Sequence, residues 1–250
     1  MKIKMIAVDL DGTVLRDDKT ISERTKSVLR KCREAGIKVA CATGRGSSNR
    51  VIPDEMLDAG ITFNGAVAKA GDTLVYNRLV PYLSARPLLI ACTERGLKAA
   101  SQFKGMHYSN FVVSDEWSYI TNFELVNFDK HDMDAEKLYV LVNNPEDIAF
   151  IEKRLATDLY VSVSRDGMAM IMHRDATKSN AVAALAEHWG IEQSEIVAFG
   201  DDMNDIDMLQ YCGIGVAMEN ALDEVKAVAD YVCDTNDNDG VAKWLEENVL

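Results

Sequence analysis

The sequence predicts an α/β protein with a doubly wound parallel sheet and an inserted α+β domain. Two observations carry this prediction. Strands and helices alternate at both ends of the 250-residue chain, whereas the middle has the pattern of antiparallel strands. The expected boundaries are 1–80 plus 174–250 for the core and 81–173 for the insertion.

The first part of the core reads as a strand, a helix and a second strand. Residues 3–10 form a near-continuous apolar run, which is typical of a parallel strand that is covered on both faces. Thr20, or alternatively Ser22, can cap the helix that follows, and Gly36 fits its end. A second apolar strand is expected at 37–42, so the unit is a right-handed βαβ crossover.

The last third of the chain repeats this alternation. Helices are expected at 180–189, 205–210, 222–227 and 241–247, and strands at 195–199, 214–217 and 231–233. Together with the N-terminal unit, these elements predict one Rossmann-like core.

The middle of the chain differs. Ala70-Gly71-Asp72 is a hairpin signal between two short strands. Beyond it, helices are expected at 87–95 and 146–155, and strands at 108–113, 117–121, 138–142, 159–164 and 168–173. This order predicts an α+β insertion rather than further βαβ units.

Composition excludes several classes of function. With 40 acidic and 27 basic residues, the net charge of −13 argues against a nucleic acid or an anionic membrane as partner. The apolar run at the N-terminus is too short for a signal peptide or a membrane span, so we expect a cytoplasmic protein. The five cysteines form no Cys-x-x-Cys pair, which predicts reduced thiols rather than a zinc site or disulfides.

Two acidic segments follow buried strands. Asp9-Leu10-Asp11-Gly12-Thr13 follows the first strand, and Gly200-Asp201-Asp202-Met203-Asn204-Asp205 follows the strand at 196–199. In open parallel sheets, ligands bind beyond the carboxyl ends of the strands. If the two strands are neighbours, five carboxylates converge there, and two charges ~4 Å apart repel by about 4 kcal/mol at an effective dielectric of 20. Oxygen ligands without His or Cys favour Mg²⁺, although each Asp alone could be a cap or loop residue.

Two further segments fit a phosphate group. Thr43-Gly44-Arg45 follows the second strand and offers a hydroxyl, backbone N–H groups and a guanidinium. Lys178 stands at the start of a helix, where its ammonium can neutralise both a carboxylate and a phosphate oxygen. Taken singly, the first could be an ordinary helix start and the second a surface lysine.

These four segments, in this order, resemble the four motifs of the haloacid dehalogenase superfamily. The place of the insertion resembles the Cof-type sugar-phosphate phosphatases with a C2-type cap, and Asn64-Gly65-Ala66 resembles a segment common in that group. Lys178 is followed by Ser179, where the family often has Gly. The resemblance implies a Mg²⁺-dependent phosphatase that hydrolyses a small phosphate monoester, such as a sugar phosphate, through an aspartyl-phosphate.

The resemblance also implies a role for each matching residue. Asp9 is the expected nucleophile, and Asp11 the acid and later the base, with a pKa raised by its acidic neighbours. Thr43 and Lys178 are expected to stabilise the charge of the transferring group. The metal ligands are expected to be Asp9, the Asp11 carbonyl and Asp201, and the orienting groups Asp202 and Asp205. Gly44, Arg45 and Asn204 are assigned to the substrate, with the alternative that Asn204 orients Asp201.

The inserted domain is expected to close over the core, exclude water and contact the leaving group. The candidate contacts are Tyr108, Trp117, His107, Arg165 and His173. For Tyr108 and Trp117 the alternative is packing against the domain's own sheet.

Three other functions compete with a phosphatase. A phosphomutase of the same superfamily would move phosphate within a sugar, and a receiver module would carry a long-lived phospho-Asp without turnover. A catalytically silent binding protein is the third. The expected partner of the phosphatase is a small phosphorylated metabolite, and both a monomer and a homodimer are compatible with the sequence.

Overall fold

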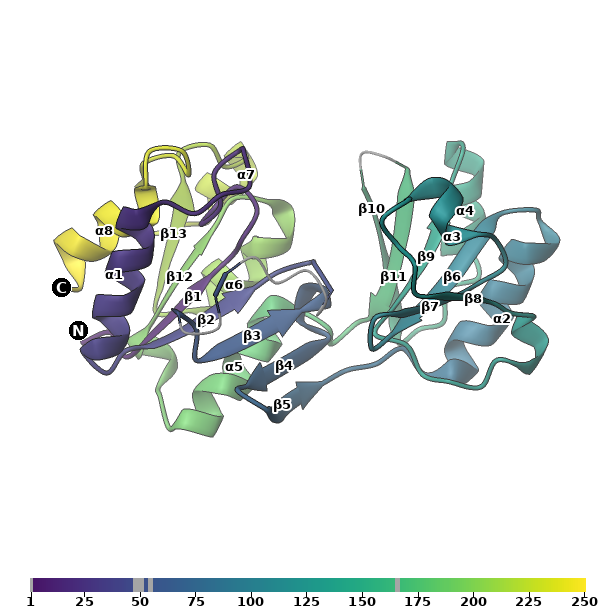
Figure 1. The fold of residues 1–250 in the computed structure, drawn as a ribbon, viewed down its shortest axis with the longest axis horizontal. Helices are drawn as coiled ribbons and strands as arrows, with labels where there is room; N and C mark the ends of the chain where they lie inside the picture. The colour runs from purple at the N-terminus through teal and green to yellow at the C-terminus, as the bar shows by residue number, and fades with distance from the viewer. Residues whose placement is uncertain (1, 47–51, 54–55, 165–166) are drawn as a thin grey trace. The chain divides into compact units, whose positions relative to one another are not determined.

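The computed structural model describes residues 2–46, 52–53, 56–164 and 167–250. The chain forms two compact units (Figure 1). Unit 1 comprises Met1–Asn77 and Thr177–Leu250, and unit 2 comprises Arg78–Ala176. Within the ranges described, none of the helices combines the length and the apolar character needed to cross a bilayer.

Unit 1 is built on an eight-stranded sheet. In spatial order its strands are β14 (Tyr231–Cys233), β13 (Ile214–Met218), β12 (Ile196–Gly200), β1 (Met5–Val8), β2 (Lys38–Ala42), β3 (Ala59–Thr62), β4 (Val67–Ala70) and β5 (Thr73–Asn77). The strands from β14 to β3 are parallel to their neighbours, and β4 and β5 are antiparallel. The predicted doubly wound parallel sheet is confirmed.

Helices cover both faces of this sheet. They are α1 (Glu23–Glu34), α5 (Lys178–Trp189), α6 (Ile206–Tyr211), α7 (Asp223–Lys226) and α8 (Gly240–Asn248), with short 3₁₀ turns η3 (Phe63–Gly65), η5 (Gln193–Glu195) and η6 (Met203–Asp205). The crossover through α1 runs along the sheet in the opposite direction to the crossover through α6, so right-handed connections place these helices on opposite faces. α1 packs with α8, and α5 packs with α6 (Figure 1). This double cover explains the apolar runs of the strands.

The N-cap of α1 is Ser22. Its Oγ accepts the backbone N–H of Thr25 at 3.0 Å, which satisfies one of the donors at the helix start. Thr20 instead donates its own N–H and hydroxyl to Asp18, so the expectation that Thr20 caps the helix is wrong and the alternative is confirmed.

Unit 2 contains a six-stranded sheet. In spatial order its strands are β10 (Leu159–Val163), β11 (Met168–His173), β9 (Lys137–Leu141), β6 (Lys98–Phe103), β7 (Met106–Ser109) and β8 (Phe123–Leu125). α2 (Tyr82–Glu94) and α4 (Pro145–Glu152) pack on one face, where Val140 is buried, and α3 (Val113–Glu116) packs on the other against Tyr139; η4 spans Phe128–Lys130. The alternation of residues along β9 thus separates two apolar layers.

Several expectations for unit 2 are wrong. The segment expected as a strand at 117–121 follows α3 as irregular structure, and the strand expected at 108–113 ends at Ser109. The helix expected from Pro87 begins at Tyr82, with the proline inside it. A proline removes one backbone hydrogen bond from a helix, but four apolar side chains of α2 are buried and hold the helix in place.

A strained turn follows β3 in unit 1. Phe63 and Asn64 have φ angles of 52° and 53°, and Gly65 has 103°. The left-handed region costs a side-chain-bearing residue about 1–2 kcal/mol, so packing must maintain this turn. A Cβ on Gly65 would lie 2.0 Å from the carbonyl oxygen of Thr177, so glycine permits the close approach of this turn to the start of α5.

We expect Gly65→Ala to lower the free energy of unfolding by roughly 3 kcal/mol or more, since it adds backbone strain to a backbone clash. Gly71→Ala is the matched control, because Gly71 also has a positive φ (56°) but its Cβ would meet nothing within 4 Å. It should cost about 1 kcal/mol. Denaturant unfolding measures both, and equal losses would show that the contact with Thr177 is not restrictive.

Candidate active site

Polar loops from five neighbouring parallel strands meet at one edge of the sheet in unit 1. Each loop begins where its strand ends, at the carboxyl edge that binds ligands in this class of sheet. The loops carry Asn220 after β13, Asp201 to Asp205 after β12, Asp9 to Thr13 after β1, Thr43 to Arg45 after β2 and Asn64 after β3. Lys178, the first residue of α5, lies among them.

Lys178 is a buried cation between two carboxylates. Its Nζ donates to Oδ1 of Asp9 at 2.6 Å and to Oδ1 of Asp205 at 2.5 Å, and it is only 1% exposed. Burial lowers the pKa of Lys178, but Asp205 and Asp9 outweigh it and hold the pKa above the ordinary range. The ammonium therefore stays charged and fixes both carboxylates.

Both oxygens of Asp205 are engaged. While Oδ1 accepts from Lys178, Oδ2 accepts the backbone N–H groups of Asp201 and Asp202 at 3.0 and 3.1 Å. Asp205 thus ties the loop after β12 to Lys178. Asp202 is exposed, and its Oδ1 accepts the N–H of Met203, so its side chain caps η6.

Asp201 approaches the loop after β1 closely. The hydroxyl of Thr13 donates to its Oδ1 at 2.6 Å. A Cβ on Gly12, which has a φ of 84°, would lie 2.2 Å from Oδ2 of Asp201, so glycine is needed here. Burial raises the pKa of Asp201 to about 6, and the bond from Thr13 opposes that rise.

These carboxylates fit a divalent cation. Asp9, Asp201 and Asp205 each offer an oxygen, and these oxygens lie within 4.8 Å of one another. Three carboxylates face one ammonium, and burial raises the pKa of Asp9 while Lys178 opposes the rise. An all-oxygen donor set suits Mg²⁺. Because Asp205 is already engaged, Asp9 and Asp201 are the side chains best placed to hold the ion.

Asp11 corrects an expectation. Arg45 donates to both of its oxygens, each at 2.6 Å, and Lys19 donates to Oδ1 at 2.9 Å. The hydrogen bonds from Arg45, with those from Lys19, lower the pKa of Asp11 to about 2 despite its partial burial. The expected rise in this pKa is wrong for this conformation, because the side chain turns to two cations rather than to the acidic cluster.

The predicted phosphate-binding residues lie in adjoining loops. Thr43 is buried, and its hydroxyl accepts the N–H of Arg45 at 3.1 Å. Gly44 packs against the side chain of Asn64, to which Asn204 donates an amide hydrogen at 2.9 Å. The structure therefore brings Thr43, Gly44 and Asn204 together, although Arg45 is turned to Asp11.

Sequence reasoning assigned no role to four residues of this site. Thr13 and Asn64 belong to the motifs described above, but nothing in the sequence indicates their hydrogen-bond partners. Asn220, whose amide donates to the Gly12 carbonyl at 2.7 Å, was detectable as a polar residue just after a parallel strand. The sequence does not indicate that Lys19 contacts Asp11, because this contact depends on the left-handed backbone conformation of Lys19 (φ 65°).

Three of the side chains expected to contact a leaving group pack within unit 2. Nδ1 of His107 lies 2.7 Å from the hydroxyl of Tyr139, and Trp117 packs edge-on against the same tyrosine ring. Tyr108 packs against His131, with ring centroids 5.3 Å apart. These contacts agree with the alternative that the aromatic residues pack against the sheet of their own domain.

The two other candidates have different outcomes. Nδ1 of His173 accepts the backbone N–H of Asp175 at 3.0 Å, a local turn contact. Arg165 lies outside the described residues.

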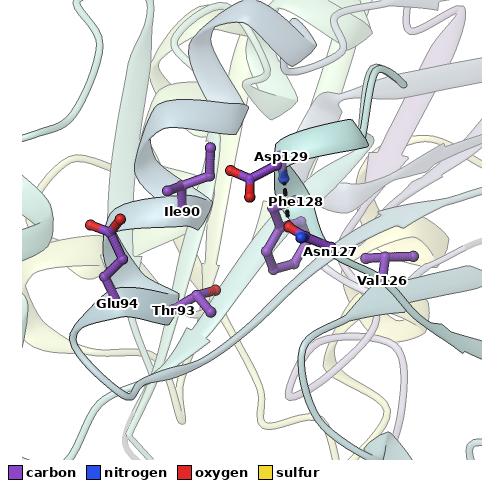
Figure 2. A pocket seen from close by; sticks show the side chains of 7 residues that line it. All are labelled: Ile90, Thr93, Glu94, Val126, Asn127, Phe128 and Asp129. Atoms are coloured by element: carbon purple, nitrogen blue, oxygen red, sulfur yellow. Dashed lines mark hydrogen bonds between the residues drawn. The ribbon is translucent and has the colours of Figure 1, made fainter.

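Unit 2 has a pocket of its own between α2 and the segment that leads into η4 (Figure 2). Its lining residues are Ile90, Thr93, Glu94, Val126, Asn127, Phe128 and Asp129. Two of its polar side chains bond locally, since Asn127 accepts the N–H of Asp129 and Thr93 donates to the carbonyl of Leu89. The carboxylate cluster, by contrast, lies wholly within unit 1.

The chain is similar to known hydrolases along almost its whole length. A family model of haloacid dehalogenase-like hydrolases matches residues 6–245. The 5-amino-6-(5-phospho-D-ribitylamino)uracil phosphatases YbjI of Escherichia coli and YitU of Bacillus subtilis are 32% and 30% identical to it, over 99% and 97% of this chain and 96% of each relative. The solved structure of a haloalkanoate-superfamily phosphatase from Bacteroides thetaiotaomicron has a TM-score of 0.85 and 26% identity, and covers 98% of this chain and 95% of its own.

The raised pKa values of Asp9 and Asp201 predict how stability depends on pH and metal. Between the ordinary carboxyl pKa of about 4 and these raised values, about 6 for Asp201 and about 8 for Asp9, the two carboxyls bind more protons in the folded protein than in the unfolded chain. Their contribution to the stability of the metal-free protein therefore falls as pH rises through this range. A cation that binds the ionised carboxylates must displace those protons. We therefore expect Mg²⁺ to raise the unfolding temperature more at about pH 7.5 than at about pH 5.

Thermal unfolding in EDTA and in Mg²⁺ at both pH values measures this difference. Asp201→Asn should abolish the shift, and Asp72→Asn, in the exposed hairpin loop, should retain it. A shift that is equal at the two pH values would contradict the assignment of these carboxylates.

Proposed function

The chain is a phosphatase of the haloacid dehalogenase-like hydrolase family, and we propose that it hydrolyses a small phosphate monoester through a covalent bond between Asp9 and phosphorus. The observation that carries this proposal is the ion pair of Lys178 with Asp9 at the carboxyl edge of the sheet. Lys178 holds Oδ1, and among the described residues no hydrogen bond to Oδ2 is found. That second oxygen is the proposed nucleophile.

In the first step, Oδ2 of Asp9 attacks phosphorus and the bond from phosphorus to the leaving oxygen breaks. Lys178 and the Thr43 hydroxyl stabilise the charge of the transferring group. Arg45 and the backbone of Gly44 bind phosphate oxygens, and Asn204 donates from the exposed loop after β12. Asp9, Asp201 and the Asp11 carbonyl would hold Mg²⁺, whose positive charge would offset the acidic groups and favour the entry of an anionic substrate.

Asp11 transfers a proton in both steps, first as an acid and then as a base. It donates a proton to the leaving alkoxide, then accepts one from the water that cleaves the aspartyl-phosphate and releases inorganic phosphate. The pairs with Arg45 and Lys19 keep Asp11 ionised in the conformation described, so it must leave them before it acts as an acid. Because Arg45 also binds phosphate in this proposal, substrate itself competes for the strongest partner of Asp11.

The site and the relatives support one class of substrate. Both ribitylaminouracil phosphatases compared above act, by name, on a phosphate carried by a ribityl chain. We assign to this chain a small polyhydroxylated phosphate monoester such as a sugar phosphate. In the same proposal unit 1 is the catalytic core, since every residue named above belongs to it, and unit 2 is the inserted cap domain.

Asp9→Asn should abolish phosphate release from p-nitrophenyl phosphate, because an amide does not attack phosphorus. Removal of Mg²⁺ with EDTA should have the same effect on the unaltered protein. Asp72→Asn is the control for an acid-to-amide change outside the site, and circular dichroism verifies that both variants fold. Turnover that persists in Asp9→Asn and in EDTA would refute the proposed function.

Asp11→Asn should slow the hydrolysis of alkyl phosphates more than that of p-nitrophenyl phosphate, whose leaving group needs no proton. General acid catalysis contributes roughly 10²–10⁴-fold, so the ratio of the two kcat values should change by about 10² or more. Steady-state kinetics with both substrates gives this ratio. Equal losses would assign Asp11 to a structural role.

A further inference from the structure

Asn64 lies where three loops of the site meet. Its backbone N–H donates to the carbonyl of Thr43 at 3.0 Å. Its side-chain Oδ1 accepts from Nδ2 of Asn204 at 2.9 Å, although the two residues lie on different strands' loops. The next residue, Gly65, packs directly against the backbone that leads into Lys178. Asn64 thus contacts the loops after β2 and β12 and adjoins the start of α5.

The position of this side chain is unusual in two ways. Asn64 follows Phe63, and both adopt the left-handed backbone region, which a buried phenylalanine rarely does. In addition, a Cβ on Gly44 would lie 2.8 Å from Oδ1 of Asn64. Two features therefore allow the Asn64 amide to reach Asn204. The backbone at Phe63 and Asn64 is strained, and residue 44 is a glycine, which has no Cβ to collide with the amide.

The contact decides which way the Asn204 amide faces. An amide has a nitrogen with two hydrogens and an oxygen that only accepts, and the two ends are nearly the same size. Since one Nδ2 hydrogen goes to Asn64, the second hydrogen diverges from that bond and is left for another acceptor, on a side chain that belongs to an exposed residue. Without this acceptor the amide could turn over and present its oxygen, which repels a phosphate oxygen.

We propose that Asn64 is a positioning residue that holds the Asn204 amide with its nitrogen toward the substrate phosphate. This inference rests on the proposed function, because it takes Asn204 as a phosphate contact. Asn64 itself does not touch the phosphate. It acts by ordering the exposed Asn204 side chain before the anion binds. The loss of conformational entropy on ordering such a side chain otherwise weakens binding.

Asn64→Gly is the sharpest test. Glycine adopts positive φ without strain, so the variant keeps the turn while it deletes the amide. We expect the KM for p-nitrophenyl phosphate and the inhibition constant of inorganic phosphate to rise about fivefold, with kcat changed by less than about twofold. The unfolding temperature should not fall. Lys104→Gly is the matched control, since Lys104 also has a positive φ (48°) but lies in an exposed turn of unit 2.

A double variant tests whether Asn64 acts through Asn204. The inhibition constant of inorganic phosphate should be the same in Asn204→Ala and in the double variant Asn204→Ala with Asn64→Gly. The reason is that the amide that Asn64 positions is absent from both. If the two substitutions instead raise this constant independently, so that their effects multiply, the proposal is wrong. It is also wrong if the inhibition constant of phosphate in Asn64→Gly is within about twofold of that of the unaltered protein. A lowered unfolding temperature with unchanged phosphate binding would likewise overturn it.

Calorimetry of inorganic phosphate binding in the presence of Mg²⁺ separates this inference from the function on which it rests. If the unaltered protein binds phosphate and Asn64→Gly binds it equally well, the inference fails while the phosphatase assignment stands. If the unaltered protein neither binds phosphate nor releases it from p-nitrophenyl phosphate, the proposed function fails first.

Discussion

The site depends on one buried ammonium group shared by two carboxylates. Lys178 joins Asp9 at the end of β1 to Asp205 after β12, and Asp205 in turn fixes the loop that carries Asp201. Charges in such a position are stable only as a set, since removing one partner of a buried pair typically destabilises a protein by roughly 3–5 kcal/mol. In the proposed function, the ammonium that orders the loops is also the group that neutralises the incoming phosphate.

Two glycines are as important for the site as its charged residues. Asp201 reaches the loop after β1 only because residue 12 has no Cβ, and the turn at Gly65 reaches Thr177 for the same reason. Each close approach brings a backbone within reach of a polar group from a distant part of the chain. Glycines at these two positions thus allow polar groups from neighbouring strand ends to lie close together.

The predictable part of the structure was set by strong local patterns. Apolar runs beside acidic motifs were enough to predict the parallel sheet and the meeting of Asp9 with Asp201, since parallel neighbours end at one edge. β6 was missed because Ala99 to Gln102 are small or polar residues whose strand state depends on their neighbours in the sheet. The partners of Asp11 were missed for a related reason: a bond to Lys19 arises from turn geometry, which single residues do not reveal.

The pairing of β1 with β12 also constrains how the molecule is assembled. Met5 lies opposite Ile196, so the central strand of unit 1 lacks one neighbour until most of the chain has been synthesised. Unit 2 is contiguous, and its strands find their partners over much shorter separations. Because long-range pairing is slow and domains tend to fold as units during synthesis, unit 2 can fold on the ribosome before β12 is available to pair with β1. The carboxylate cluster of Asp9, Asp201 and Asp205 is then completed only after unit 2 has been synthesised.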